Sequence, residues 1–178
     1  SSDLGYPASD SAADRDAARL FDAYQNGWVL DPLLTGRYPD ALWRYWKGCE
    51  PLVLPGDMET IARPMDYLGL NFYSRSVLRG EGGDTFEWVS RPEAEHTTMG
   101  WEVHPQGLED ILVDLHARYP SLPPIYITEN GMSSNDAVVD GQVDDLQRRA
   151  YLKRHFAACS RAMERGVDVR GYFVWSLM

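Results

Sequence analysis

Cysteine, histidine and basic residues are all scarce in this chain of 178 residues, and each scarcity excludes a kind of protein. The two cysteines, Cys49 and Cys159, lie far apart and form no C-x-x-C motif, so the sequence predicts neither a disulfide framework nor a zinc site. We interpret both as packing residues. The four histidines show no metal-ligand spacing such as H-E-x-x-H. We therefore expect no metal and no other cofactor.

Long apolar runs and net positive charge are also missing. No stretch approaches the roughly 18 consecutive apolar residues that a membrane span needs, so no membrane contact is expected. Lysine and arginine total 17 against 27 aspartates and glutamates, and the net charge of -10 argues against a nucleic-acid partner because it repels phosphate backbones. A hydrophobic content of 44% is enough for one core. We expect a soluble, cytoplasmic globular protein that binds a neutral ligand.

Hydrophobic periodicity predicts helices that alternate with strands. Apolar residues at steps of three and four predict helices over 14–28, 107–119 and 144–164, and Asp31-Pro32 is expected to stop the first of them. The last helix is expected to bury Leu152, Phe156, Cys159 and Met163. Short helical turns are expected near 39–46 and just before Pro64.

Strands are predicted over 67–73, 125–129 and 172–178, where apolar residues alternate or β-branched residues cluster. Residues 77–104 are rich in glycine and charge and are interpreted as a long loop with room for a small hairpin. The resulting βαβ order implies a parallel sheet. The final strand has no turn, cap or covering helix after it, so we expect the chain to be a piece of a larger protein.

The tetrapeptide Thr128-Glu129-Asn130-Gly131 places a carboxylate where a short strand gives way to a loop. Barrel and open α/β enzymes hold their catalytic groups at the carboxyl ends of parallel strands. Alternation would put Glu129 on the same strand face as Ile125 and Ile127. Taken alone, however, the tetrapeptide favours a solvated strand-end residue or one paired with an arginine.

Three segments considered together change this interpretation, because they resemble in order and spacing the signature strands of glycoside hydrolase family 1. The segments are Leu68-Gly69-Leu70-Asn71-Phe72-Tyr73, Ile125-Tyr126-Ile127-Thr128-Glu129-Asn130-Gly131 and Gly171-Tyr172-Phe173-Val174-Trp175-Ser176-Leu177. Further resemblances are Asp31-Pro32-Leu33, Gly36-Arg37-Tyr38-Pro39 and Met99-Gly100-Trp101-Glu102-Val103. Together they extend over nearly the whole chain.

The resemblance implies a fold class and an activity. The fold would be α/β, the C-terminal part (about strands 6–8) of a (β/α)8 TIM barrel, with residues 1–178 forming a single partial domain. The activity would be that of a retaining β-glycosidase, above all a β-glucosidase, that cleaves β-linked glycosides or oligosaccharides. The resemblance sets neither the glycone preference nor the oligomeric state.

The resemblance also implies roles for five residues. Glu129 occupies the position of the nucleophile, and Tyr73 that of the tyrosine which orients it. Asn71 matches a polar substrate-binding residue on the strand of Tyr73, although a buried amide satisfied by backbone is the alternative. Trp175 matches the floor of the glycone site and Trp101 the wall of the aglycone side. For both tryptophans the alternative is a place in the core.

One departure from the family pattern limits these expectations. Retaining glycosidases need a second carboxyl group as acid/base, and the Asn-Glu-Pro motif that supplies it in the family is absent from this sequence. We therefore expect this chain alone to be inactive and to expose an interior face around Ile125, Ile127 and Trp175. The alternative is a non-catalytic carbohydrate-binding or complementation fragment, in which Trp175 and Trp101 matter and Glu129 does not.

Overall fold

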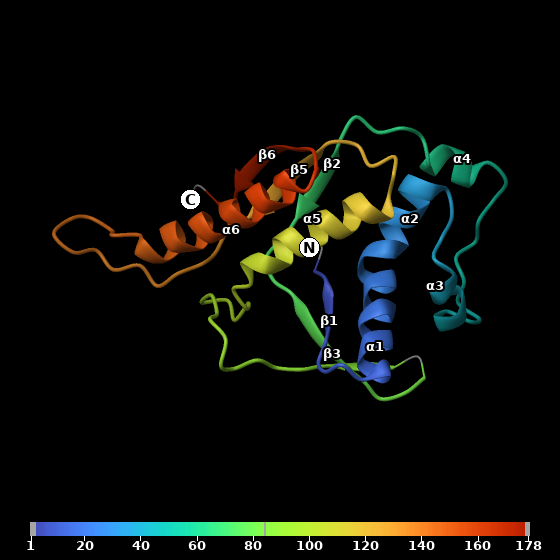
Figure 1. The fold of residues 1–178 in the computed structure, drawn as a ribbon, viewed down its shortest axis with the longest axis horizontal. Coiled ribbons are helices and arrows are strands. Elements are labelled where there is room, and N and C mark those ends of the chain that lie inside the picture. Colours follow the sequence, from blue (N-terminus) through green and yellow to red (C-terminus); the bar gives the residue numbers. More distant parts are fainter. Residues whose placement is uncertain (1–2, 84, 177–178) are drawn as a thin grey trace.

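The computed structural model of the protein describes residues 3–83 and 85–176, which form two three-stranded sheets and the helices around them (Figure 1). The first sheet is wholly parallel, in the order β2 (Leu68–Asn71), β5 (Ile125–Asn130) and β6 (Val169–Val174). The second joins β1 (Gly5–Pro7), β3 (Ser76–Gly80) and β4 (Phe86–Trp88).

The helices account for the remaining regular structure. In chain order they are α1 (Ala12–Asp22), the π-helical η1 (Ala23–Gly27), α2 (Trp28–Thr35), α3 (Asp40–Tyr45), α4 (Asp57–Ile61), α5 (Pro105–Arg118) and α6 (Leu146–Glu164). Among the described residues, none of these helices is long and apolar enough to cross a membrane. The predicted turns near 39–46 and before Pro64 are confirmed as α3 and α4.

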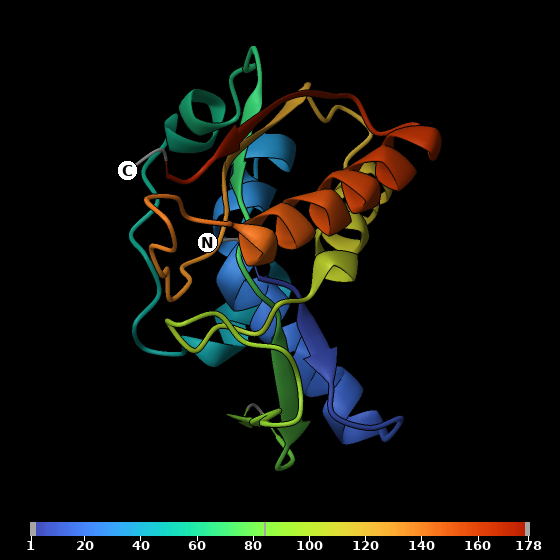
Figure 2. The same cartoon turned by 90° about the vertical axis from the view of Figure 1, so that its left-hand side faces the viewer.

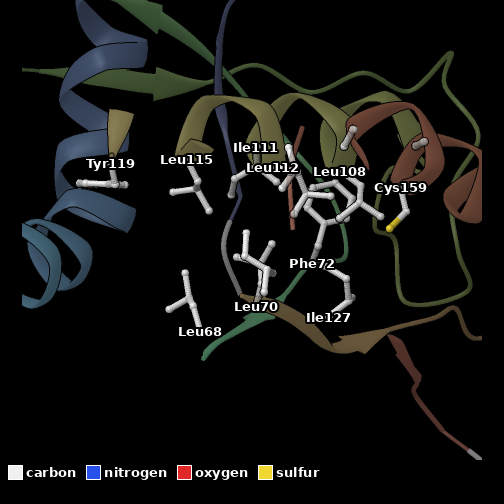
Figure 3. Close-up of a cluster of buried hydrophobic side chains, with 14 of the residues drawn as sticks. Leu68, Leu70, Phe72, Leu108, Ile111, Leu112, Leu115, Tyr119, Ile127 and Cys159 are labelled. Carbon is white, nitrogen blue, oxygen red and sulfur yellow. The ribbon is translucent and has the colours of Figure 1, made fainter. Parts of the chain in front are cut away.

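The main core lies between the parallel sheet and two helices. Helices α5 and α6 pack against each other over one face of β2, β5 and β6 (Figures 1 and 2). Figure 3 shows the stripe on α5 facing the buried side chains of the strands. From α5 these are Leu108, Ile111, Leu112 and Leu115. Facing them are Leu68 and Leu70 of β2, Phe72 directly after β2, and Ile127 of β5. The other face of the sheet carries the polar and aromatic residues.

The first helical segment is longer than predicted, because Asp31-Pro32 does not stop it. Helix α1 passes through the π-helical η1 into α2, and Pro32 lies inside α2 with its ring buried. The segment ends instead at Gly36, which adopts a left-handed conformation (φ 75°) and donates its N–H to the carbonyl of Pro32. A left-handed C-cap suits glycine because it has no Cβ to clash.

Strand β5 does not follow the simple alternation that we predicted. Ile125 and Ile127 are fully buried beneath the helices rather than exposed on an interior face. The register with β2 shifts after Leu70, so that Asn71 is opposite Glu129 instead of Thr128. This β-bulge inserts one extra residue and moves Glu129 to the opposite face from the two isoleucines. The prediction that these three residues share a face was therefore wrong.

Two further expectations need correction. Phe156 and Met163 of α6 are exposed, and Leu152 is only half-buried, whereas Cys159 is buried as predicted. The helix buries smaller and polar side chains instead: Tyr151, His155, Ala158, Cys159 and Ala162. The last strand spans 169–174 rather than 172–178, and residues 177–178 lie outside the described residues.

The segment 77–104 does contain the hairpin for which we allowed, since β3 and β4 pair antiparallel. Sequence reasoning missed β1, a strand of three residues that pairs in parallel with β3. Such a short strand offers too few residues for alternation to be recognised.

Candidate active site

The side chains of Glu129 and Tyr73 meet at the carboxyl end of the parallel sheet. The hydroxyl of Tyr73 donates a hydrogen bond to Oε2 of Glu129 across 2.8 Å, although the two residues are 56 positions apart. Both side chains are half-buried. Burial raises the pKa of the Tyr73 phenol, and the neighbouring carboxylate raises it further. The phenol therefore keeps its proton at neutral pH and remains a donor to the carboxylate.

Backbone hydrogen bonds fix the peptide that carries Glu129 to both neighbouring strands. The N–H of Phe72 donates to the carbonyl of Glu129 at 3.0 Å, and the N–H of Trp175 donates to the carbonyl of Asn130 at 2.9 Å. Gly131 follows, and a Cβ there would lie only 1.9 Å from the carbonyl oxygen of Trp175. Only glycine permits this close approach of the two strand ends.

Asn130 is a contributor that sequence reasoning left without a role. Its side chain is fully buried, and its amide donates to the carbonyl of Phe72 at 2.8 Å and to the hydroxyl of Tyr151 at 3.0 Å. Its amide oxygen accepts a hydrogen bond from the hydroxyl of Tyr172. One side chain thus links β2, α6 and β6 immediately behind Glu129. A buried amide with all these partners rigidifies its surroundings.

Both predicted tryptophans lie beside Tyr73. The ring centroid of Trp101 is 5.0 Å from that of Tyr73 with the planes tilted by 53°, and the ring of Trp175 lies edge-on to Tyr73 at 6.2 Å. Trp175 is 47% exposed, so it is not a core residue in the described chain. Trp101 is half-buried in the loop between β4 and α5. The structure therefore brings Glu129, Tyr73 and both indoles into one cluster.

Asn71 is opposite Glu129 in the strand register, and its side chain faces the same side of the sheet. Its Oδ1 accepts a hydrogen bond from the hydroxyl of Thr128 at 2.7 Å. The alternative prediction for Asn71, a buried amide satisfied by backbone, does not describe this partner. Thr128 was not singled out from the sequence. The bulge places Glu129 opposite Asn71 while Thr128 remains within hydrogen-bond distance of it.

The arrangement combines a carboxylate, a phenol donor and two flat apolar rings. A carboxylate held by a neutral donor can act as a nucleophile, and indole faces suit the apolar C–H faces of sugar rings. Within the part of the chain that the structure describes, no group of three or more His, Cys, Asp or Glu side chains could hold a metal ion.

The fold and this cluster together define a class: a segment of a (β/α)8 barrel with a carboxylate site at the carboxyl ends of its strands. Residues 1–178 match the family model described as glycosyl hydrolase family 1. The chain belongs to this family, and the predicted fold class, part of a TIM barrel, is confirmed.

Several individual members of the family are similar to this chain in sequence. It is 42% identical over 188 residues to a bifunctional β-D-glucosidase/β-D-fucosidase of Bifidobacterium breve, a match that covers 93% of this chain and 40% of the relative. It is 35% identical to a 6-phospho-β-galactosidase of Clostridium acetobutylicum, covering 97% of this chain and 43% of the relative.

The structural comparison agrees with the sequence comparison. The family 1 β-glucosidase of Thermotoga maritima, solved in complex with isofagomine lactam, superposes with a TM-score of 0.91 at 34% identity. That match covers 98% of this chain and 40% of the solved chain. The chain thus spans about 40% of the length of the curated relatives that it matches.

Proposed function

We propose that this chain is the C-terminal part of a retaining β-glycosidase, with residues 1–178 forming one partial domain of its barrel. Glu129 is the nucleophile: it attacks the anomeric carbon of the substrate, the glycosidic C–O bond breaks, and a covalent glycosyl-enzyme forms that water then hydrolyses. Tyr73 orients the carboxylate. Trp175 and Asn71 bind the sugar, and Trp101 binds the leaving group.

The observation that carries this proposal is the hydrogen bond of 2.8 Å from Tyr73 to Glu129, flanked by the two indoles. Donation from a phenol that keeps its proton holds the carboxylate in one orientation and supports its charged form. A solvated strand-end glutamate would need neither this donor nor its aromatic neighbours. This is what favours an enzyme over a purely carbohydrate-binding fragment.

The proposed substrates are β-linked glucosides and related glycosides or oligosaccharides. Support comes from the names of the relatives, which include β-glucosidases and a β-D-fucosidase. We also propose that the protein is cytoplasmic. No metal or other cofactor is needed for the chemistry, because two carboxyl groups about 5–5.5 Å apart suffice in retaining glycosidases.

Residues 1–178 alone are proposed to be inactive, because the sequence holds no Asn-Glu-Pro motif to supply the acid/base carboxyl group. The nucleophile would then depend on a carboxyl group from elsewhere in the full-length protein. Purified residues 1–178 should hydrolyse no aryl β-glycoside, including those with the best leaving groups.

The test is the substitution Glu129→Gln in the full-length protein. It preserves the shape of the side chain but removes the attacking charge, so the rate of glycosyl-enzyme formation should fall by about three to five orders of magnitude, about 4–7 kcal/mol of activation free energy. Binding of a sugar-mimicking inhibitor should largely survive. A mechanism-based fluorosugar should label Glu129 of the wild type, as located by mass spectrometry of peptides.

A second variant and a control complete this test. Glu129→Ala should regain partial turnover with added azide and release a product of inverted configuration, because the anion attacks in place of the carboxylate. Glu164→Gln, at an exposed position at the end of α6, should retain the wild-type rate. Labelling of another carboxylate, or a near-normal rate for Glu129→Gln, would refute the assignment and leave the carbohydrate-binding alternative.

A further inference from the structure

Trp101 lies on a loop, yet its ring keeps a defined place against Tyr73. In the described chain, the segment between β4 and α5 contains no helix and no named strand. Local hydrogen bonds shape it: the N–H of Thr97 donates to the carbonyl of Trp101 at 2.9 Å, and the N–H of Val103 donates to the carbonyl of Glu95 at 2.8 Å. These bonds fix the loop's own conformation but do not attach it to the segment between β2 and β3, which carries Tyr73.

That attachment comes from Arg75 and Glu102. Arg75 lies two residues after Tyr73, and Glu102 directly follows Trp101. The guanidinium donates twice to the carboxylate, from Nε to Oε2 at 3.1 Å and from Nη2 to Oε1 at 2.8 Å. The hydroxyl of Ser74 adds a third bond, to the carbonyl of Glu102 at 3.0 Å. We call Arg75, Ser74 and Glu102 the loop clamp.

The environment of the loop clamp makes it more than a surface ion pair. The side chains of Arg75 and Glu102 are only 15% and 11% exposed, whereas those of Arg79 and Glu87 in the neighbouring hairpin are 55% and 46% exposed. The guanidinium also lies 5.1 Å from the ring centroid of Tyr6, which restrains it from the other side. Solvent screens a buried bidentate pair less than an exposed one, and its fork geometry allows one orientation.

The consequence concerns the position of the indole. The loop clamp joins the residues next to Tyr73 and Trp101, whose ring centroids are 5.0 Å apart. The same loop is also tied to α6, because Arg154 donates twice to Glu95, but that pair lies further from the indole along the chain. Errors of about 1 Å in such positions can reduce rates by about a hundredfold. The rest of the cluster, Glu129 and Trp175, is held by strand hydrogen bonds that do not involve the loop.

We propose that Arg75 and Glu102 are positioning residues that fix Trp101 beside Tyr73 and thereby set how strongly the enzyme discriminates among leaving groups. This rests on the proposed function, because it assigns the loop clamp to the leaving-group side of that site. A clamp with a purely structural role would lower stability and slow all substrates alike. A positioning role predicts a selective effect.

The experiment compares Glu102→Gln with Glu87→Gln, its matched control in the exposed pair, in the full-length protein. For Glu102→Gln, kcat/KM on aryl β-glucosides with bulky leaving groups should fall by about tenfold relative to methyl β-glucoside, while the inhibition constant of a glycone-mimicking inhibitor should change by less than about twofold. Glu87→Gln should behave as the wild type. Equal losses on every substrate would overturn the proposal.

A double-mutant cycle tests whether the effect passes through the indole. In the Trp101→Ala background, Glu102→Gln should cause no further loss of discrimination, because the positioned group is already gone. Exchanging the charges, with Arg75→Glu and Glu102→Arg together, should restore part of the selectivity that either substitution alone removes. Additive losses in the cycle would refute a role through Trp101.

A readout without catalysis separates this inference from the proposed function. In protein labelled with 5-fluorotryptophan, the fluorine resonance of Trp101, assigned with Trp101→Phe, should shift or broaden in Glu102→Gln and not in Glu87→Gln. If the wild type hydrolyses no β-glycoside, the proposed function fails, yet a shifted resonance still establishes the clamp. An unchanged Trp101 resonance in Glu102→Gln would overturn the clamp, whatever the protein's activity.

Discussion

At the scale of single residues, Tyr73 connects the parts of the candidate site. Its hydroxyl contacts Glu129, and its ring contacts Trp101 on one side and Trp175 edge-on on another. A tyrosine can do both because it has a polar tip on a rigid apolar ring. The two tryptophans contact the same ring but are held differently, Trp175 by the end of β6 and Trp101 by a loop.

This difference leads to a prediction for the two indoles. In the full-length protein, Trp175→Ala should weaken sugar binding and turnover more than Trp101→Ala, because Trp175 is assigned to the reacting sugar and Trp101 to a leaving group that varies. Loss of a well-packed aromatic contact is worth about 2–4 kcal/mol, so the effect of Trp175→Ala on kcat/KM should reach about a hundredfold or more. Steady-state kinetics on aryl glycosides would measure it.

The exposed Trp88 of β4 provides the matched control, since it lines the same hollow as Trp101 but its ring contacts Phe21 and Phe86. Trp88→Ala should leave kcat/KM near the wild-type value. Equal small losses for Trp175→Ala and Trp101→Ala would mean that both indoles serve packing rather than substrate binding.

At the scale of elements, α6 buries a histidine that should make stability depend on pH. His155 is fully buried, stacks on Tyr151 and has no hydrogen-bond partner for Nε2. The pKa of His155 falls from 6.5 to about 4, mainly because the imidazole is buried. The charges of Arg154 and His104 also lower this pKa, whereas the hydrogen bond with the carbonyl of Tyr151 and the charge of Glu95 raise it. The folded protein thus holds the imidazole neutral where an unfolded chain would protonate it.

The sign of the effect follows from that difference. As the pH falls below about 6.5, the unfolded state takes up a proton that the folded state refuses until about pH 4, so the free energy of unfolding decreases across this window. The contribution of His155 should be a loss of about 2 kcal/mol between pH 8 and pH 5. Urea unfolding of the full-length protein at these two pH values would measure it.

Carboxylates also titrate in this range, so the comparison must be with a variant. His155→Gln should lose less stability between pH 8 and pH 5 than the wild type, whereas His116→Gln, at an exposed position on α5, should lose as much. An identical pH dependence in His155→Gln and the wild type would show that this imidazole does not control acid stability.

The elements also show how far the sequence could predict the structure. Alternation correctly predicted β2 with Leu68, Leu70 and Phe72 on one face, and the structure shows that this face is buried. The same rule failed in β5, where the bulge moved Glu129 to the other face. A bulge depends on the pairing with neighbouring strands, and local sequence carries no record of that pairing.

The candidate site, like the fold, was predictable only in part. The motif resemblance selected Glu129, Tyr73 and both tryptophans, and these four cluster in the structure. The contacts behind them were not predictable. Asn130 and the loop clamp act through partners distant in sequence, which periodicity cannot identify.

At the scale of the whole molecule, one face of the parallel sheet lacks a cover among the described residues. Helices α5 and α6 cover one side (Figure 2). The other side presents large aromatic side chains. The exposed fractions are 57% for Tyr67, 58% for Phe173 and 47% for Trp175. An aromatic surface of this kind marks an interface or an aggregation site.

We therefore expect purified residues 1–178 to be self-associated or poorly soluble. The exposed aromatic face and the open edges of β2 and β6 would pair between molecules. Sedimentation velocity across a range of concentrations would measure the association. Phe173→Ser should reduce it, whereas Val138→Ser, which removes an exposed apolar residue of the loop before α6, should not. A monodisperse monomer with a cooperative thermal transition would contradict this expectation.

The bulge in β5 also has a consequence for anyone who redesigns this scaffold. An idealised strand, with every residue paired and no insertion, would look like an improvement in regularity. Removing the extra residue would, however, change the parity of every position beyond Ile127, and Glu129 would turn toward the helices and their apolar side chains. An unpaired carboxylate is costly in such surroundings. An irregularity of one residue therefore decides which face of the sheet receives the carboxylate of the proposed nucleophile, and the most regular version of this strand would lose the proposed site.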